Sequence, residues 1–258
     1  MGGGLAPPGG GVPRAERASE AGDDPRVVLF DMDDTIFDHS RTCRAALGRL
    51  RREYDAWGDR PLDDVWQEYG RLLGITHTDV MLGRRTSQEV RAERFRRLAR
   101  WAGRSISASA ADELSRAYRE RYQRLRRPVP GAPAAVRRWH DRARVVIVTN
   151  NTVDEQVEKI AFLGLTDAVD ALVTSEEIGV GKPDARIFRA ALERAGGDAP
   201  STVMVGDSWS SDIVGARGAG IRAVWFNRFG ESPGRGANVA EFRSFRGGRQ
   251  LDRLLVGP

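Results

Sequence analysis

The sequence predicts an α/β protein with a parallel sheet at its core and a second, all-helical unit inserted after the first strand. Short uninterrupted apolar runs recur along the chain, as in strands that are buried on both faces of a parallel sheet. Helical patterns separate most of these runs, and such alternation is typical of a sheet covered on both sides. Residues 39–127 break the alternation. A chain of 258 residues is long enough for both units.

The composition excludes several classes of protein. Hydrophobic residues make up 40% and charged residues 30%, which argues against collagen-like and wholly disordered chains. The single cysteine, Cys43, cannot form an internal disulfide, and three histidines without ligand spacing argue against structural zinc. No apolar run reaches the roughly 20 residues that span a bilayer, and no secretory signal is evident. We therefore expect a cytoplasmic protein with no membrane partner.

The formal net charge of +5 raises the question of a nucleic-acid partner. Of the 41 basic residues only Lys159 and Lys182 are lysines, and the arginines are spread through nearly every helical pattern. The densest arginine runs, 91–104 and 116–127, are interrupted by apolar residues at helical spacing, as in a solvated helix face. This distribution indicates a general arginine bias, and we expect no nucleic-acid polymer as partner.

The chain begins with residues 1–25, which are rich in Gly, Pro and Ala without periodicity and are expected to be a disordered tail. The fold then starts at Arg26, with the first strand at 27–30. Four further strands are predicted, at 145–148, 171–173, 202–205 and 223–226.

Two helices of the core carry recognisable end signals. One is expected over 152–163, where Thr152 and Glu155 have capping-box spacing and Gly164 follows the end. The other is expected over 184–195, because its apolar residues fall on one face of a helix.

Between the first two strands, residues 39–127 show only helical periodicity, and four helices fit them best. An insert of about 90 residues is too long for an ordinary connection. We therefore expect a core made of 26–38 and 128–258 and a second small domain made of 39–127.

Polar residues that could carry chemistry follow the predicted strands. Each alone is more often a turn former or a helix cap. Because ligands of parallel sheets bind beyond the carboxyl ends of the strands, we expect these residues to meet in one site. They are Asp31-Met32-Asp33-Asp34-Thr35, Thr149-Asn150-Asn151, Gly181-Lys182-Pro183-Asp184, and Gly206-Asp207 with Asp212.

Carboxylates gathered at one edge of a sheet repel one another unless a cation lies among them. Lys182 and the hydroxyl of Thr149 add a positive charge and a hydrogen-bond donor to the same edge. A hard cation with oxygen ligands, beside a lysine and free backbone amides, suits a phosphate dianion. The sequence therefore predicts a phosphoryl substrate and Mg²⁺.

On these residues the sequence resembles the haloacid dehalogenase-like hydrolases. That family's four motifs occur here in order, as Asp31-x-Asp33-x-Thr35, Thr149, Lys182 and Gly206-Asp207 through Asp212. The resemblance covers about residues 26–258. It implies a Rossmann-like core, and it identifies the helical insert as a cap of the first-position type.

The resemblance also implies a role for each motif residue. Asp31 would be the nucleophile that forms an aspartyl phosphate, and Asp33 would protonate the leaving oxygen and later deprotonate water. Mg²⁺ would be held by the carboxylates of Asp31 and Asp207 and by the backbone carbonyl of Asp33.

The remaining motif residues would bind the substrate or support the site. Thr149 and the Asn150 amide would bind phosphate oxygens, and Lys182 would neutralise the nucleophile and the phosphoryl group. Asp212 is expected to support Lys182 or the metal's waters from outside the ligand set, although its place at a helix start also suits an N-cap.

Several alternatives remain open. Asp33 favours a phosphatase over a 2-haloacid dehalogenase, because dehalogenases of this family lack that second carboxylate. A phosphomutase would use the same motifs, whereas a non-catalytic scaffold would have no need for gathered carboxylates. The expected partner is a small phosphorylated metabolite, and the oligomeric state is left unpredicted.

Resemblance to the pyrimidine 5′-nucleotidase-like branch suggests a nucleoside 5′-monophosphate as substrate. Phe37, His39 and Arg41 are candidates for the mouth of the site, with hinge packing as the alternative. Four aromatic residues of the insert could stack on a base, but at helical spacing they could equally form a core: Tyr54, Trp57, Trp66 and Tyr69.

Overall fold

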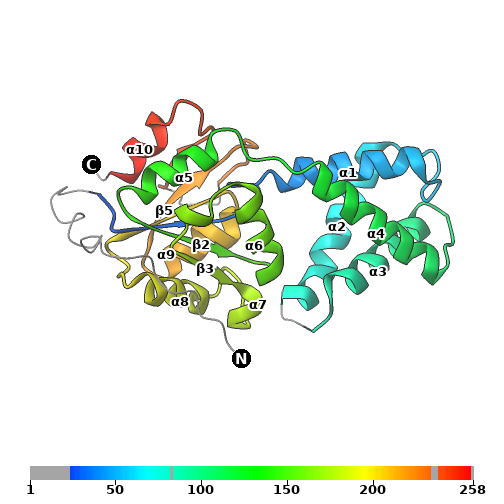
Figure 1. Ribbon diagram of the computed structural model, residues 1–258, viewed down its shortest axis with the longest axis horizontal. Helices are drawn as coiled ribbons and strands as arrows, with labels where there is room; N and C mark the ends of the chain where they lie inside the picture. Colours follow the sequence, from blue (N-terminus) through cyan, green and yellow to red (C-terminus); the bar gives the residue numbers. More distant parts are fainter. Residues whose placement is uncertain (1–23, 82–83, 234–237, 257–258) are drawn as a thin grey trace.

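The structure is a computed structural model that describes residues 24–81, 84–233 and 238–256. Of the tail expected over 1–25, all but the last two residues lie outside the described residues. Figure 1 shows a sheet flanked by helices and, to its side, a separate group of four helices, α1 to α4. No helix in the described ranges is long and apolar enough to cross a membrane.

Six parallel strands form one sheet in the order β3-β2-β1-β4-β5-β6, which confirms the predicted α/β class. The five predicted strands are present, and their ends differ from the prediction by one residue at most. The sixth was not predicted, because three residues that include a glutamate form no apolar run. The strands are β1 (Val27–Phe30), β2 (Arg144–Thr149), β3 (Ala171–Thr174), β4 (Thr202–Gly206), β5 (Arg222–Phe226) and β6 (Ala240–Phe242).

Alternate residues of β1 point to opposite faces of the sheet, and helices cover both faces. Phe30 belongs to a hydrophobic cluster with Trp139, whereas Leu29 belongs to a second cluster with Phe188. The helices on the first face are α5 (Ala132–His140), α6 (Val153–Phe162) and α10 (Arg249–Leu255). Those on the second face are α7 (Ser175–Ile178), α8 (Ala185–Ala195) and α9 (Val214–Gly218).

Four helices occupy the described part of the insert 39–127, as the periodicity predicts, and this part contains no strand. They pack on one another around aromatic residues, with Trp57 stacked on Phe95 and Tyr118 edge-on to the same ring. Their bounds are α1 (His39–Glu53), α2 (Leu62–Met81), α3 (Ser87–Trp101) and α4 (Ala108–Arg124).

The predicted capping box at the start of α6 is wrong. Thr152 makes no side-chain cap bond, and the first helical amide, that of Val153, is bound by the Glu176 carboxylate at 2.9 Å. The Glu155 carboxylate lies 3.4 Å from the ammonium of Lys159 instead. Glu176 of α7 therefore caps the start of α6 in place of Thr152, and Glu155 pairs with Lys159 within the helix.

Close packing between α8 and α9 makes Gly215 a sensitive position. A Cβ at Gly215 would lie 2.7 Å from Phe188 and 2.9 Å from the backbone Cα of Pro183. We expect Gly215→Ala to lower the free energy of unfolding by about 1–3 kcal/mol, because this overpacking must be relieved by backbone movement. Chemical denaturation measures the change.

Gly218→Ala in the same helix is the matched control, because a Cβ at Gly218 meets nothing within 4 Å. Alanine is the better helix former, so this variant should be neutral or more stable by up to about 1 kcal/mol. Equal destabilisation by the two substitutions would contradict the packing described here.

Candidate active site

The turn after β1 directs the acids of the first motif. Asp34 has a φ of 65°, in the left-handed region that few non-glycine residues adopt. Its carboxylate accepts a hydrogen bond from the backbone amide of Ser40 at 2.9 Å, and its carbonyl accepts one from Arg228 at 3.2 Å. A short polar side chain that hydrogen-bonds nearby backbone makes the left-handed conformation accessible to Asp34.

Asp31 follows the last residue of β1 and is buried beside Lys182. The ammonium Nζ of Lys182 lies 2.6 Å from Asp31 Oδ1 and 2.6 Å from Asp212 Oδ1, and it donates to the carbonyl of Val148 at 2.8 Å. Burial raises the pKa of Asp31 to about 7 against the opposing charge of Lys182. Burial opposes the charge of Lys182 as well, but Asp212 and Asp31 outweigh it and raise its pKa.

The backbone of Lys182 is held by the side chain of Asn150. Asn150 Oδ1 accepts from the Lys182 amide at 2.7 Å, and Asn150 Nδ2 donates to the Lys182 carbonyl at 2.9 Å. Gly181 is required here, because a Cβ would lie 2.7 Å from Asn150 Oδ1. The side chain of Asn150, a predicted binding residue, is therefore engaged with the backbone of Lys182. The backbone amide of Asn150 is the group that remains available for a phosphate.

Asp31, Asp207 and Asp212 bring one carboxylate oxygen each within 4.8 Å of one another, a grouping that could hold a metal ion. Burial raises the pKa of Asp207 well above its usual range, and Asp31 and Asp212 raise it further. One lysine cannot neutralise three acids, so this donor set fits a hard divalent cation.

Asp212 reaches this cluster from a single turn of π-helix, Trp209–Ile213. Such turns often occur at functional sites, because they re-aim one side chain. Ser208 caps the turn, so the alternative role of Asp212 as an N-cap is wrong. The Asp212 carboxylate accepts from the Ser208 amide at 2.9 Å, and a Cβ at Gly206 would collide with it.

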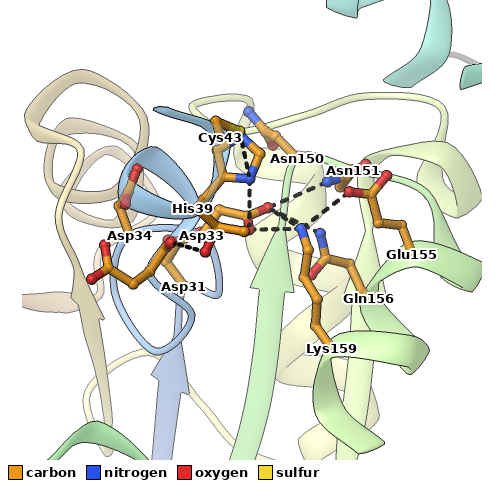
Figure 2. Close-up of polar contacts among 12 residues, drawn as sticks. Asp31, Asp33, Asp34, His39, Cys43, Asn150, Asn151, Glu155, Gln156 and Lys159 are labelled. Atoms are coloured by element: carbon orange, nitrogen blue, oxygen red, sulfur yellow. Dashed lines mark hydrogen bonds and ion pairs between the residues drawn. The ribbon is translucent and has the colours of Figure 1, made fainter. Parts of the chain in front are cut away.

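Asp33 lies apart from this cluster, in a second group of polar side chains (Figure 2). Lys159 of α6 donates to both carboxylate oxygens of Asp33, at 2.7 and 2.9 Å, and Gln156 donates at 3.1 Å. Burial alone would raise the pKa of Asp33, but the charges of Lys159 and His39 outweigh it and hold that pKa well below its usual range. Asp33 is therefore ionised at neutral pH.

His39, the first residue of α1, borders the same group. Its Nδ1 lies 3.6 Å from Asp33 Oδ1 and 2.9 Å from the hydroxyl of Tyr122, and its Nε2 lies 3.3 Å from the thiol of Cys43. Burial opposes its protonation, but Cys43 and Asp33 raise the pKa of His39 to about 10.

A cavity of about 190 Å³ joins Asp33 to the inserted helices. His39 lines it, in agreement with the prediction of a mouth residue, whereas Phe37 is fully buried and Arg41 lies outside the lining. Of the four aromatic residues considered for base stacking, only Tyr69 lines the cavity. His77 of α2 closes part of it by contacting the carbonyl of Asn150 at 3.1 Å.

The structure brings the predicted residues to one edge of the sheet. Thr149 ends β2 beside the Asp31 strand, and its hydroxyl makes no hydrogen bond to any residue in the described ranges. Sequence reasoning missed Gln156 and Lys159, which lie one and two helical turns beyond Thr152. The sequence did carry a signal for Lys159, because only two of the chain's 41 basic residues are lysines.

Comparison with known proteins gives a consistent result. A sequence model of the haloacid dehalogenase-like hydrolases matches residues 25–220. Pyrimidine 5′-nucleotidase YjjG of Escherichia coli is 32% identical over 78% of this chain and 85% of its own length. Phosphoserine phosphatase of Thermus thermophilus is 30% identical over 79% of this chain and 89% of its own length.

Among solved structures, the HAD-hydrolase YfnB of Bacillus subtilis, bound to magnesium, has a similar fold. The TM-score is 0.71, the identity is 26%, and the match covers 90% of this chain and 99% of that protein.

The contact between Lys159 and Asp33 can be measured as a coupling energy. We expect Lys159→Met and Asp33→Asn to show a coupling of about 1–3 kcal/mol at pH 7 in a double-mutant cycle of unfolding free energies. Because the pKa of Asp33 is lowered in the folded state, this stabilisation is complete above its ordinary value of 3.8 and decreases as the pH falls below it.

The matched control is the more exposed pair of Arg119 and Glu158, whose nitrogen and oxygen lie 2.6 Å apart. Its coupling, measured with Arg119→Met and Glu158→Gln, should stay below about 1 kcal/mol. A coupling between Lys159 and Asp33 no larger than this value would show that the buried contact is absent in solution.

Proposed function

The chain belongs to the haloacid dehalogenase-like hydrolases, and on that premise we propose that it is a Mg²⁺-dependent phosphatase acting on a small phosphomonoester. The observation that carries the proposal is the burial of Asp31 against Lys182, 2.6 Å from its ammonium, with Asp207 and Asp212 beside it. Both named phosphatase relatives, each at least 30% identical, support the same reaction class.

In the first step a carboxylate oxygen of Asp31 attacks phosphorus and the ester P–O bond breaks, which leaves an aspartyl phosphate. The electron pair of the broken bond stays on the leaving oxygen, and Asp33 supplies its proton. The dianionic phosphoryl group raises the pKa of Asp33 when it enters the cavity, because like charges disfavour ionisation. Protonation of Asp33 then weakens its contact with Lys159.

In the second step water attacks phosphorus, and the bond to Asp31 breaks to release phosphate and the free carboxylate. Asp33 accepts the proton of that water, and the Lys159 contact favours the ionised form required for this. Thr149 offers its hydroxyl to a phosphate oxygen, the Asn150 backbone amide offers a second donor, and Lys182 neutralises the negative charge.

Asp31, Asp207 and the backbone carbonyl of Asp33 would hold Mg²⁺, and the position of Asp212 in the acidic cluster adds a fourth candidate oxygen. When bound, the ion neutralises charge on the transferring phosphoryl group. Burial, and after it the neighbouring carboxylates, raise the pKa values of Asp31 and Asp207, and a cation among these acids would stabilise their ionised forms.

The substrate itself is proposed only as a class, a small phosphomonoester. Nucleoside 5′-monophosphates are one candidate, supported by the nucleotidase relative and by the tyrosine rings that line the cavity. Their hydrolysis can be compared with that of other phosphomonoesters in the same assay.

Release of p-nitrophenol from its phosphate ester tests the activity. We expect turnover with Mg²⁺, a loss with a chelator, and a decrease of at least a thousandfold in Asp31→Asn, which removes the nucleophile. Asp59→Asn, at an exposed residue of the insert, is the control and should keep full activity. Metal-independent turnover, or halide release from 2-chloropropionate in place of phosphatase activity, would contradict the proposal.

Binding of Mg²⁺ can also be detected without turnover, as a rise in the thermal unfolding midpoint. The rise should be larger at pH 8 than at pH 6, because Asp31 with a pKa of about 7 must lose its proton to bind a cation. Asp207→Asn should abolish the rise, whereas Asp59→Asn should preserve it. A pH-independent rise that survives in Asp207→Asn would place the ion elsewhere.

A further inference from the structure

Arg94 of α3 is a buried cation without a carboxylate partner. It is only 5% exposed, yet its hydrogen bonds go to neutral hydroxyls, those of Tyr69 at 2.9 Å and Thr76 at 3.2 and 3.3 Å. Within the described ranges no acidic side chain lies within ion-pair distance of it. The guanidinium carbon also lies 5.1 Å from the centre of the Tyr69 ring, a cation–π contact that offsets part of the cost of burial. Because a buried charge without a counter-ion remains costly, an anionic ligand at this position would stabilise it.

Two neighbouring arginines do have carboxylate partners. Arg97, on the solvent side of α3, pairs with Glu93 at 2.8 Å, and Arg119 of α4 pairs with Glu158 at 2.6 Å. Arg91 stands three residues before Arg94 and makes no ion pair or hydrogen bond with any residue that the structure describes. The expectation that the 91–104 run is a solvated face is therefore wrong for Arg94, which points inward from it.

Arg91 and Arg94 both line the cavity that also contains Asp33. Two acids border this cavity, Asp33 and Glu155, and two cations lie within ion-pair distance of them, Lys159 at 2.7 Å from Asp33 and Arg119 at 3.9 Å from Glu155. The acids are thus already compensated, and the two arginines leave an excess of positive charge on the side of the inserted helices.

Some N–H groups of the Arg94 guanidinium have no acceptor among the described residues. Of its five N–H groups, three have the neutral partners named above, one each on Nε, Nη1 and Nη2. One N–H on Nη1 and one on Nη2 therefore remain without an acceptor among the residues that the structure describes. Two donors on the two Nη atoms of one guanidinium can bind the oxygens of a carboxylate or a phosphate.

We propose that Arg94, assisted by Arg91, binds a second anionic group on the leaving alcohol of the substrate. The substrate class is then a phosphomonoester that carries a carboxylate or a second phosphate, with its scissile phosphoryl group at Asp31. This inference rests on the proposed phosphatase function and deepens it. A nucleoside 5′-monophosphate presents a neutral nucleoside to Arg94 and should be a poorer substrate.

The test uses the full chain with Mg²⁺ and three matched series of substrates. The first series contains ω-phosphooxy carboxylic acids of increasing chain length, the second the diol monophosphates of the same lengths, and the third the diol bisphosphates. The first two differ only by a carboxylate in place of a hydroxymethyl group, and varying the length covers the unknown separation between the two anionic groups.

At the best length we expect kcat/KM to be at least tenfold higher for the carboxylate or bisphosphate than for the alcohol. Arg94→Met should reduce this preference to twofold or less, and Arg94→Lys should keep part of it, because it retains the charge but loses the fork. Arg97→Met, at an exposed residue of the same helix, should leave the preference unchanged. The two anionic series show which group is bound.

An independent readout is stability. Since Arg94 is a buried charge without a counter-ion, Arg94→Met should not lower the thermal unfolding midpoint, whereas a purely structural arginine would. The inference is overturned if the wild type hydrolyses the esters without preference at every length, or if Arg94→Met keeps the preference. Absence of hydrolysis of every ester would instead overturn the phosphatase function on which it rests.

Discussion

The ion pairs of Lys182 with Asp31 and Asp212 are the contacts on which the site depends. Two buried carboxylates beside a third, that of Asp207, would repel one another without them. The sheet order makes the contacts possible, because β1 lies between β2 and β4, so that Asp31, the carbonyl of Val148 and the acids after β4 lie at one edge. Gly206 leaves the space that the Asp212 carboxylate occupies, and Gly181 leaves the space for the Asn150 side chain that holds the backbone of Lys182.

Each of the two lysines of the chain forms an ion pair with one acid of the first motif. Lys182 accompanies Asp31, whose pKa is raised to about 7 by burial, and Lys159 accompanies Asp33, whose pKa is lowered. Two carboxylates only two residues apart thus have opposite ionisation behaviour, because burial dominates at Asp31 whereas the charges of Lys159 and His39 outweigh burial at Asp33. A compact ammonium serves both buried positions.

The fold could be predicted from the sequence wherever a local pattern determined the structure. The apolar runs of β1 to β5 and the periodicity of α1 to α4 needed no tertiary information, but β6 is too short to be recognised by its pattern. The motif residues were predicted because strand ends share one edge of the sheet. Lys159 and Arg94 were missed, because their burial depends on which face of α6 or α3 meets the cavity, and an arginine on an amphipathic helix usually faces solvent.

The most direct test of the covalent pathway through Asp31 is the stereochemistry of hydrolysis. The substrate is a phosphorothioate monoester that is chiral at phosphorus, hydrolysed in isotopically labelled water. Attack by Asp31 followed by attack of water inverts phosphorus twice, so the configuration should be retained overall. Net inversion would show that water attacks the ester directly, and it would contradict the role assigned to Asp31.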